Sequence, residues 1–378
     1  MSATRQRPTV LVAGLGDTGL LTAIHLARHC DVVGVSVKPG LVSGQELGTR
    51  IARPDDWARD YWIPFDRYRG LEQVRIVHGT LIGLDTGRRR VEIERPDATT
   101  IHEGYDALVI STGVRNGFWR RPTLQTAHEV DADLAATHEY LTRAHSIVVI
   151  GGGAAAVSAA ANVAAVLPDA DVDLYFPRDA ALPDHHPRVW RHVRRRLERL
   201  GVGLHPGHRA RVPDTGPPAE IAAGTVEWTT GQPAVTAHAV LWAIGAVRPN
   251  TEWLPSAMLD PDGFVRVTDE LRVVGYSEIF AVGDVAATDP LRNSARNRAD
   301  RLVAENIRAA FNGKPLRHYH ARHRRWGSVL GIQDDGLEVF APNGRPFRFP
   351  AWSIDSVLQP WIVRRGIYGG IRPRSDTR

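Results

Sequence analysis

The stretch Thr-Val-Leu-Val-Ala-Gly-Leu-Gly-Asp-Thr-Gly, residues 9–19, decides the fold. Its first five residues are aliphatic or β-branched, which is typical of a buried parallel strand. Three glycines follow, then a helix-forming segment at 20–29 and a second apolar strand at 31–37. This order predicts a βαβ unit whose glycine-rich turn lets a phosphate approach the N-terminus of the helix.

The same order recurs at residues 146–176. Residues 144–168 contain no Asp, Glu, Lys or Arg and are long enough to cross a bilayer. However, Gly151-Gly152-Gly153 directly follows the β-branched run 147–150, which predicts a strand, a tight turn and an alanine-rich helix instead. One glycine fingerprint is weak evidence, but two between a strand and a helix strongly indicate two dinucleotide sites.

Composition limits the remaining possibilities. The 378 residues allow two or three domains, and 43% hydrophobic with 24% charged residues is typical of a globular protein. The only cysteine, Cys30, excludes an intramolecular disulfide and a thiolate zinc site. No secretory signal is recognisable at the N-terminus, which favours the cytoplasm.

Basic and histidine-rich stretches offer two further interpretations. Residues 188–200 place apolar residues on one helical stripe and arginines on the other face. No nucleic-acid motif accompanies them, so we expect a solvated helix rather than a nucleic-acid partner. We expect no metal site, because the histidines lack partners at ligand spacing: His185, His186, His318, His320 and His323.

Three more segments fall in a recognisable order: 105–113, 240–245 and 278–286, each an apolar run that ends in small residues. Together with the two fingerprints, over residues 8–312, they give a resemblance. The chain resembles the FAD- and pyridine-nucleotide-dependent oxidoreductases that include glutathione reductase, ferredoxin reductases and type II NADH dehydrogenases. This resemblance implies an α/β protein with two Rossmann-like dinucleotide-binding domains and a small C-terminal α+β segment. We expect the FAD domain at 1–118 and 247–312, the NAD(P) domain at 119–246 and the C-terminal segment at 313–378.

The resemblance also assigns cofactor-binding residues. On the FAD side it implies that Asp284 and Asn297 tune the flavin, and it indicates the following contacts: Gly14, Gly16, Asp17, Thr18, Gly19, Thr112, Gly113, Gly283 and Arg296. Lys38 is a candidate contact to a phosphate of FAD, and Arg50 is a further cationic candidate that a solvated surface arginine explains equally well. For Asp284, a helix N-cap is a compatible alternative. On the NAD(P) side it indicates Gly151, Gly153, Ala154, Ala155, Ala156, Arg178 and Gly245.

The chain departs from the family pattern in three places. The loop at 38–48 lacks the CxxxxC pair of the disulfide reductases, so an acceptor must meet the flavin directly. Lys38 stands where an acidic residue usually holds the adenosine ribose, and Ser158 stands where many relatives have a glutamate. Arg178 follows the second strand of the NAD(P) unit, where it could pair with a 2′-phosphate, although Asp179 is adjacent. We therefore expect NADPH rather than NADH.

The C-terminal residues 357–368 mix Trp, Ile and Tyr with arginine. Type II NADH dehydrogenases and ferroptosis-suppressor relatives hold a membrane- or quinone-facing segment here. Alternatively, these residues pack on the FAD domain or against a second subunit of a homodimer. The acceptor pocket is expected around Gln45, Trp57, Tyr61 and this segment.

The sequence thus predicts a flavoenzyme that passes electrons from NAD(P)H through FAD to a small-molecule acceptor such as a quinone. Two alternatives stay open. A ferredoxin-type carrier or a specialised biosynthetic substrate could exchange the electrons, or the protein could be a flavin-binding sensor or scaffold with little turnover.

Overall fold

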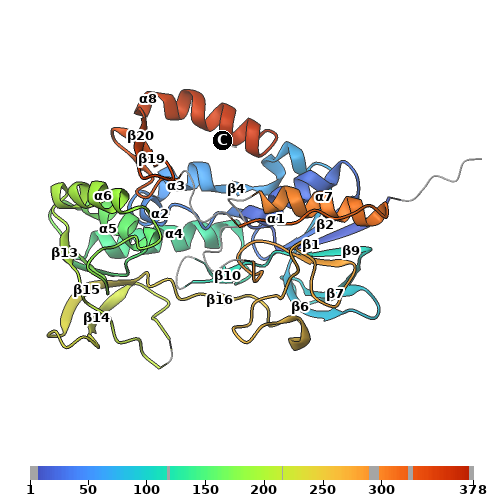
Figure 1. The fold of residues 1–378 in the computed structure, drawn as a ribbon, viewed down its shortest axis with the longest axis horizontal. Coiled ribbons are helices and arrows are strands. Elements are labelled where there is room, and N and C mark those ends of the chain that lie inside the picture. The colour runs from blue at the N-terminus through green and yellow to red at the C-terminus, as the bar shows by residue number, and fades with distance from the viewer. Residues whose placement is uncertain (1–6, 117–119, 215, 289–297, 322–326, 374–378) are drawn as a thin grey trace, which may run out of the picture.

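The computed structural model describes residues 7–116, 120–214, 216–288, 298–321 and 327–373. Two units, each built on a sheet of mainly parallel strands, stand side by side, and a small C-terminal sheet and helix lie across them (Figure 1). Within the described residues, no helix is long and apolar enough to span a membrane.

The first unit is built on a parallel sheet that we call sheet A. Its strands are, in spatial order, β17 (Ile279–Ala281), β9 (Ala107–Ile110), β1 (Thr9–Ala13), β2 (Asp31–Ser36) and β5 (Val74–His78). The sequence-distant β17 therefore pairs with β9 and completes the sheet. Helices α1 (Asp17–Ala27) and α7 (Ala299–Phe311) pack on one face of sheet A.

The other face of sheet A is covered by an antiparallel sheet and by the segment that precedes β17. The strands of that antiparallel sheet are β6 (Thr80–Asp85), β7 (Arg90–Glu94) and β8 (Thr100–Gly104). Around sheet A lie short elements: β3 (Gly40–Val42), α2 (Leu47–Ala52), α3 (Pro54–Tyr61), β4 (Trp62–Pro64), η1 (Phe65–Arg67), η2 (Arg69–Leu71) and η3 (Ser256–Met258).

The second unit is built on sheet B, whose three central strands repeat the βαβ pattern. Its strands are, in spatial order, β13 (Gly203–His205), β12 (Asp171–Tyr175), β11 (Ser146–Ile150), β15 (Val235–Trp242) and β14 (Ala222–Val226). Helices α5 (Ala154–Val166) and α6 (Pro187–Arg199) cover one face. The antiparallel pair β10 (Val114–Arg115) and β16 (Arg248–Pro249) connects the two units.

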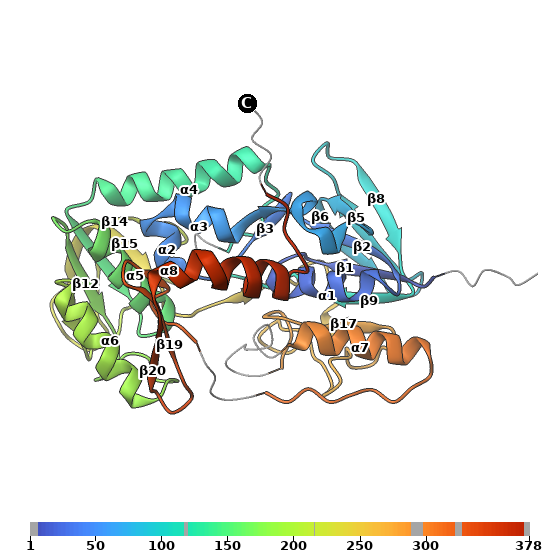
Figure 2. The same cartoon turned by 90° about the horizontal axis from the view of Figure 1, so that it is seen from above.

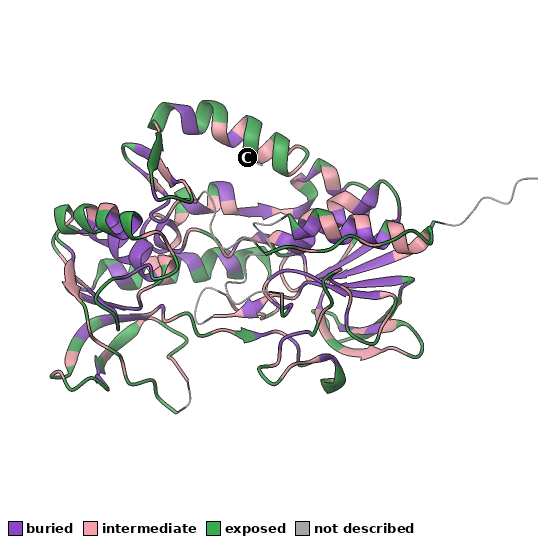
Figure 3. Cartoon of the chain, in the orientation of Figure 1, coloured by how far each residue is buried: buried purple, intermediate pink, exposed green. Residues whose placement is uncertain are grey.

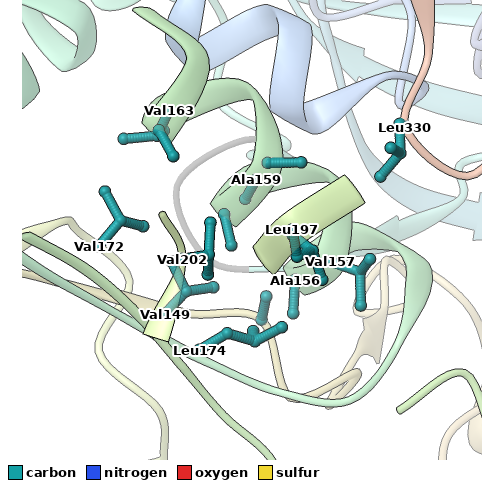
Figure 4. Packing of buried hydrophobic residues seen from close by; sticks show 14 of the residues in the cluster. Val149, Ala156, Val157, Ala159, Val163, Val172, Leu174, Leu197, Val202 and Leu330 are labelled. Atoms are coloured by element: carbon teal, nitrogen blue, oxygen red, sulfur yellow. The ribbon is translucent and has the colours of Figure 1, made fainter. Parts of the chain in front are cut away.

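The uncharged stretch at 144–168 is therefore β11, a turn and α5, as the sequence predicts. Alanines on α5 let the helix lie close to sheet B. Val149, Val157 and Leu174 belong to the core between this helix and the sheet (Figure 4). The predicted basic helix at 188–200 is α6, which buries Val189, Trp190, Val193 and Leu197 as expected. Helix α4 (Ala127–Thr142) begins at Thr126, where Thr126 and Glu129 form a reciprocal cap.

The C-terminal segment contributes a three-stranded sheet and a helix. The strands are β18 (Ile332–Gln333), β19 (Gly336–Phe340) and β20 (Pro346–Phe349), and they are followed by α8 (Ala351–Ser353) and by η5 (Ile354–Ile367), which we call the C-terminal helix. Seen from above, this helix runs across the molecule beside α2 and α3 (Figure 2).

The C-terminal segment packs on both units. Val329, Leu330 and Phe340 belong to the core of the sheet B unit. Further along, Tyr68 pairs with Ile371 as an isolated bridge and meets Tyr368 edge-on, which attaches the last described residues to the sheet A unit. The strands of both sheets match the two predicted Rossmann-like units, whereas the domain boundaries given above stay a prediction.

Candidate functional site

A cleft of about 960 Å³ lies at the carboxyl ends of the strands of both sheets. Both glycine-rich turns open into it, together with residues from the C-terminal segment. In open α/β sheets, ligands bind at this end of the strands. The cleft is large enough for extended cofactors and is the candidate site.

The first turn has glycine where side chains have no room. Gly14 adopts a left-handed φ of +100°, and a Cβ there would lie 2.6 Å from the Ser111 carbonyl oxygen. A Cβ on Gly19 would lie 1.9 Å from the carbonyl oxygen of Gly14. At Gly16, in contrast, no atom lies within 4 Å of the Cβ position. The turn is therefore tight on the protein side and open on the side of the cleft.

The second turn repeats this geometry. Gly151 has a φ of +141°, and its Cβ would lie 2.2 Å from the Ala243 carbonyl oxygen, while Gly153 has open space. Ala156 occupies the third position and is completely buried against sheet B. Ala154 and Ala155, the first residues of α5, line the cleft.

Both helices that follow these turns begin without a side-chain cap. Gly16 is the N-cap of α1 and Gly153 is the N-cap of α5, and neither cap has a side-chain hydrogen bond. The first backbone N–H groups of each helix are therefore available to an anion, and the helix dipole favours negative charge there. This cradle fits a dinucleotide pyrophosphate in each unit. Thr18 of α1 lies close to Gly283, since a Cβ on Gly283 would be 3.4 Å from the hydroxyl oxygen of Thr18.

Asp17 organises the loop that replaces the thiol pair. Its carboxylate accepts hydrogen bonds from the Ser43 hydroxyl at 2.6 Å, from the Gly44 N–H at 3.1 Å and from the Gln45 side chain at 3.3 Å. The indole of Trp57, which is fully buried, donates to the Gln45 carbonyl at 3.0 Å. Gln45 thus lines the cleft as predicted, whereas Trp57 supports it from behind.

The crossover after β9 is held by Asn250, which sequence reasoning missed. Thr112 donates its hydroxyl to the Asn250 carbonyl at 2.7 Å, and the Asn250 amide donates to the Thr112 carbonyl at 2.9 Å. The Asn250 N–H also donates to the Gly113 carbonyl. Thr112 and Gly113 are thereby fixed in the wall of the cleft. Gly245, which follows β15, and Gly283, which follows β17, line the same cleft.

Asp284 lies in the cleft as predicted, and its carboxylate has a partner that sequence reasoning missed. Arg120 donates to Asp284 at 2.6 Å and reaches the Gly44 carbonyl at 3.3 Å. Arg120 thus connects three parts of the chain across the cleft. No motif marked it, because it lies in the irregular segment between β10 and α4.

Lys38 and Arg50 line the same cleft near the end of β2. The ammonium of Lys38 donates to the Thr123 carbonyl at 2.7 Å and to the Gln125 side chain. Burial lowers the pKa of Lys38 to about 8. Burial also lowers the pKa of Arg50 to about 10, and its guanidinium carbon lies 5.0 Å from the Trp57 ring centroid. Both cations line the cleft, and their contact with a cofactor phosphate stays a prediction.

Ser158 is buried where α5 meets α2. A Cβ on Gly48 would lie 2.3 Å from the Ser158 carbonyl oxygen, so the two helices are in close contact. Asn162 donates to the Ser158 carbonyl and to the Leu330 carbonyl, which joins α5 to the C-terminal segment. The small side chain of Ser158 is thus part of this contact as well as of the cleft wall.

Arg178 is exposed after β12 and is not among the residues that line the cleft. The lining on this side includes Asp184, His185 and His186, and the facing wall comes from Ala341 and Pro342 of the C-terminal segment. The sequence predicts the C-terminal segment over the flavin. In the structure this segment lines the same cleft as the first residues of α5, which follow the second glycine-rich turn.

Two predicted residues, Arg296 and Asn297, lie outside the described residues. Within the described ranges, the histidines, acidic residues and cysteine form no cluster of three that could hold a metal ion. His192 instead pairs with Glu338 at 2.9 Å and joins α6 to β19.

Comparison with known proteins adds three findings. The model of the pyridine nucleotide-disulphide oxidoreductase family matches residues 8–310. Oxidoreductase OXR1 of Ajellomyces capsulatus is 27% identical over 338 residues, covering 78% of this chain and 72% of that protein. Ferroptosis suppressor protein 1 of Xenopus tropicalis is 27% identical over 321 residues, covering 82% of this chain and 83% of that protein.

Solved structures share the fold. An engineered water-forming NADPH oxidase bound to NADPH superposes with a TM-score of 0.64 and 19% identity, covering 88% of this chain and 75% of that one. The water-forming NADH oxidase of Lactobacillus brevis bound to NADH also has a TM-score of 0.64, with 20% identity and coverage of 88% and 74%.

Proposed function

This chain belongs to the pyridine nucleotide-disulphide oxidoreductase family, as an FAD-dependent NAD(P)H oxidoreductase, and on that basis we propose that it reduces a small molecule of the quinone class directly at the flavin. In the balanced reaction, NAD(P)H, a proton and a quinone are converted to NAD(P)⁺ and a hydroquinone. It needs no further reductant and no thiol.

The observation that carries the proposal is the loop at Ser43, Gly44 and Gln45. Hydrogen bonds to Asp17 hold this loop in the wall of the cleft, where a thiol relay would otherwise stand. The single cysteine, Cys30, is buried at the far end of α1, just before β2, and does not line the cleft. Burial raises the pKa of its thiol, which disfavours the reactive thiolate.

The residues of this chain bind and orient the two cofactors. The open N-termini of α1 and α5 would hold one pyrophosphate each, and Asp284 would accept a hydrogen bond from a hydroxyl of the flavin side chain. FAD, when bound, supplies the hydride acceptance and the electron transfer. Arg120 forms an ion pair with Asp284 at 2.6 Å and so fixes the position of this carboxylate in the cleft.

Exposed apolar side chains on the C-terminal segment support a lipid-soluble acceptor. Trp352, Trp361 and Ile362 are 72%, 59% and 49% exposed, and Figure 3 shows this helix with exposed residues along much of its outer surface. Arg365 lies over the Trp361 ring, so charge and aromatic surface occur together. Such a combination suits the interface of a bilayer with anionic lipids, and we include peripheral membrane contact in the proposal.

For the nicotinamide cofactor we propose NADPH. Arg178 is exposed in the segment after β12, outside the lining of the cleft, so its guanidinium is accessible to a 2′-phosphate that extends from the cleft, which it would bind in a bidentate manner. Structural neighbours bind either nucleotide. Under this proposal an Arg178→Ala variant loses turnover with NADPH and keeps turnover with NADH.

The test is an anaerobic acceptor screen on the FAD-loaded protein. NADPH serves as donor, and a short-chain benzoquinone and a plant-type ferredoxin serve as acceptors. Reduction of the quinone at a rate independent of salt supports the proposal. Salt-sensitive reduction of ferredoxin alone would favour a carrier protein, because association of charged proteins is screened by salt. Slow flavin reduction by both nucleotides would favour a sensor or scaffold.

A further inference from the structure

A second cavity, of about 800 Å³, lies at the amino edge of sheet A. Its lining includes Thr9 at the start of β1, Ala107 at the start of β9 and Glu278 just before β17. These strands are parallel, so their carboxyl ends, and the cofactor cleft, lie at the opposite edge. The cavity is therefore separate from the cleft described above.

Among the described residues, four cationic side chains line this cavity: Arg7, Arg89, Arg272 and Lys314. Two of them already have hydrogen-bond or ion-pair partners within the protein. Arg7 donates to the Ala27 and Cys30 carbonyls at 2.8 and 2.9 Å, and Arg89 lies 3.8 Å from the Glu278 carboxylate.

Arg272 and Lys314 differ from these two. Within the described part of the chain, neither side chain has a hydrogen bond or an ion pair. The Nε of Arg272 is buried without a partner, and its guanidinium carbon lies 5.7 Å from the centroid of the buried Phe280 ring. The terminal amino groups of Arg272 also have no partner among the described residues, and Arg272 lines the cavity, so these groups are available to a ligand there.

The groups that would oppose an anion are satisfied by the protein. Asp106 accepts the Thr9 N–H at 2.7 Å, and Glu278 accepts the Ser277 hydroxyl at 2.7 Å. At the end of α7, the Ala309 carbonyl accepts the N–H groups of Asn312 and Lys314. The two acidic side chains and the helix end thus have partners, and the cations of the lining outnumber its two carboxylates, which gives the cavity a net positive charge.

The remaining lining residues are apolar or small polar ones. Ala310 and Phe311 of α7 border the cavity with partly exposed side chains, whereas Phe280 and Ile307, which also line it, are buried. A cavity of this size and mixed lining is typical of a small-molecule site. The apolar surface of Ala310 and Phe311 beside two unpaired cations fits a molecule with a flat or apolar body and a phosphate group.

We propose that this cavity binds a small phosphorylated molecule with a planar body, with Arg272 and Lys314 holding the phosphate and Ala310 and Phe311 contacting the body. Arginine and lysine both recognise phosphate, arginine through its fork and lysine as a point charge. The site is independent of the proposed quinone reduction, because it lies at the other edge of sheet A.

Binding of ADP to the FAD-loaded protein tests this inference. Saturating NADP⁺ is present throughout, so that the nucleotide cleft is occupied, and isothermal titration calorimetry measures the remaining binding. We expect one ADP per chain. We also expect Arg272→Gln and Lys314→Gln each to raise the Kd about tenfold, which corresponds to about 1.4 kcal/mol. Adenosine, which lacks the phosphate, should bind at least tenfold more weakly, by the same relation.

Controls keep the result interpretable. Arg211→Gln removes an exposed arginine of the sheet B unit and should leave ADP binding unchanged. Lys314 is exposed, so Lys314→Gln tests the site even if Arg272→Gln weakens the packing on Phe280. Absence of ADP binding, equal binding of adenosine, or unchanged binding in Lys314→Gln would overturn the proposal.

Discussion

Arg120 donates a 2.6 Å hydrogen bond to Asp284 from the opposite wall of the cofactor cleft. The two residues are 164 positions apart in the sequence, and the pair joins the segment after β10 to the end of β17. Because the same guanidinium also reaches the Gly44 carbonyl, Arg120 orders the carboxylate and the loop that replaces the thiol pair at the same time.

Replacement of Asp284 by Asn should weaken FAD binding. The variant loses the ion pair with Arg120 and the charged acceptor for the cofactor. A hydrogen bond to a charged group contributes about 1.5–3 kcal/mol, so the Kd for FAD should rise roughly tenfold or more. Titration of the cofactor-free protein, followed by quenching of flavin fluorescence, measures this. Asp262→Asn, at an exposed turn outside the cleft, is the matched control. If the Kd of the Asp284 variant for FAD is within twofold of that of the unaltered protein, Asp284 does not contribute to FAD binding.

Two glycines of the same turn should respond differently to alanine. At Gly16 the Cβ meets no atom within 4 Å, so Gly16→Ala should fold normally and lose FAD affinity, because the methyl group enters the space for the pyrophosphate. At Gly19 the Cβ would lie 1.9 Å from the Gly14 carbonyl oxygen. Gly19→Ala should therefore lose roughly 1–3 kcal/mol of folding stability or more. Thermal unfolding without cofactor, combined with FAD titration, separates the effects. Equal losses of stability would contradict this description of the turn.

Lys38 should make stability depend on pH above neutrality. Burial lowers the pKa of Lys38 from 10.5 to about 8 in the folded protein. Between pH 8 and 10.5 the unfolded chain holds a proton that the folded chain has released, so the free energy of unfolding rises with pH in this window. Below about pH 8 both states are protonated and the cost of burying the charge is present in full.

Comparison with Lys38→Met isolates this contribution. The stability of the unaltered protein relative to the variant should increase by about 2 kcal/mol between pH 7 and pH 10. Urea unfolding of the cofactor-free proteins at several pH values measures it. Parallel stability curves for the two proteins would show that Lys38 is not buried as described.

The C-terminal helix should govern contact with lipid. Trp361 and Ile362 are exposed, whereas Arg364 holds the helix to the buried Asp60 at 2.9 Å. We expect the double substitution Trp361→Ser and Ile362→Ser to reduce flotation with anionic liposomes several-fold, because each loses about 1.5–3 kcal/mol of apolar transfer energy. Turnover of a water-soluble quinone should not change.

A control variant distinguishes lipid binding through the C-terminal helix from nonspecific adsorption of the protein to liposomes. Val212 is 41% exposed, well before the C-terminal segment in the sequence, and Val212→Ser should float like the unaltered protein. If the unaltered protein does not float with liposomes, the membrane part of the proposal fails, while quinone reduction in solution is unaffected.

The sequence predicts the two glycine-rich turns because their determinants are local. β1, the turn and α1 follow one another within residues 9–27, and the same holds for β11, the turn and α5. Strand periodicity and glycine spacing therefore locate both helix N-termini. The strand β17 is also recognisable, because its apolar run ends in Gly283 and Asp284.

The contacts that shape the cleft could not be predicted, because they join distant residues. Asn250 meets Thr112 across 138 positions, and Lys38 meets Gln125 across 87. Neither Asn250 nor Arg120 belongs to a motif, so only the folded arrangement identifies them. The close contact between Gly48 and Ser158, which accompanies the loss of the expected glutamate, is of the same kind.

The measurement that tests the central claim most directly is anaerobic reduction and reoxidation of the flavin in the Cys30→Ala protein. The FAD-loaded variant is mixed with NADPH, and a benzoquinone is added after the flavin absorbance has bleached. If electrons pass directly from the flavin to the acceptor, the flavin bleaches and recovers with one quinone per flavin, at the rates of the unaltered protein. Loss of reoxidation in Cys30→Ala, or failure of the flavin to bleach with either NADPH or NADH, would contradict the account.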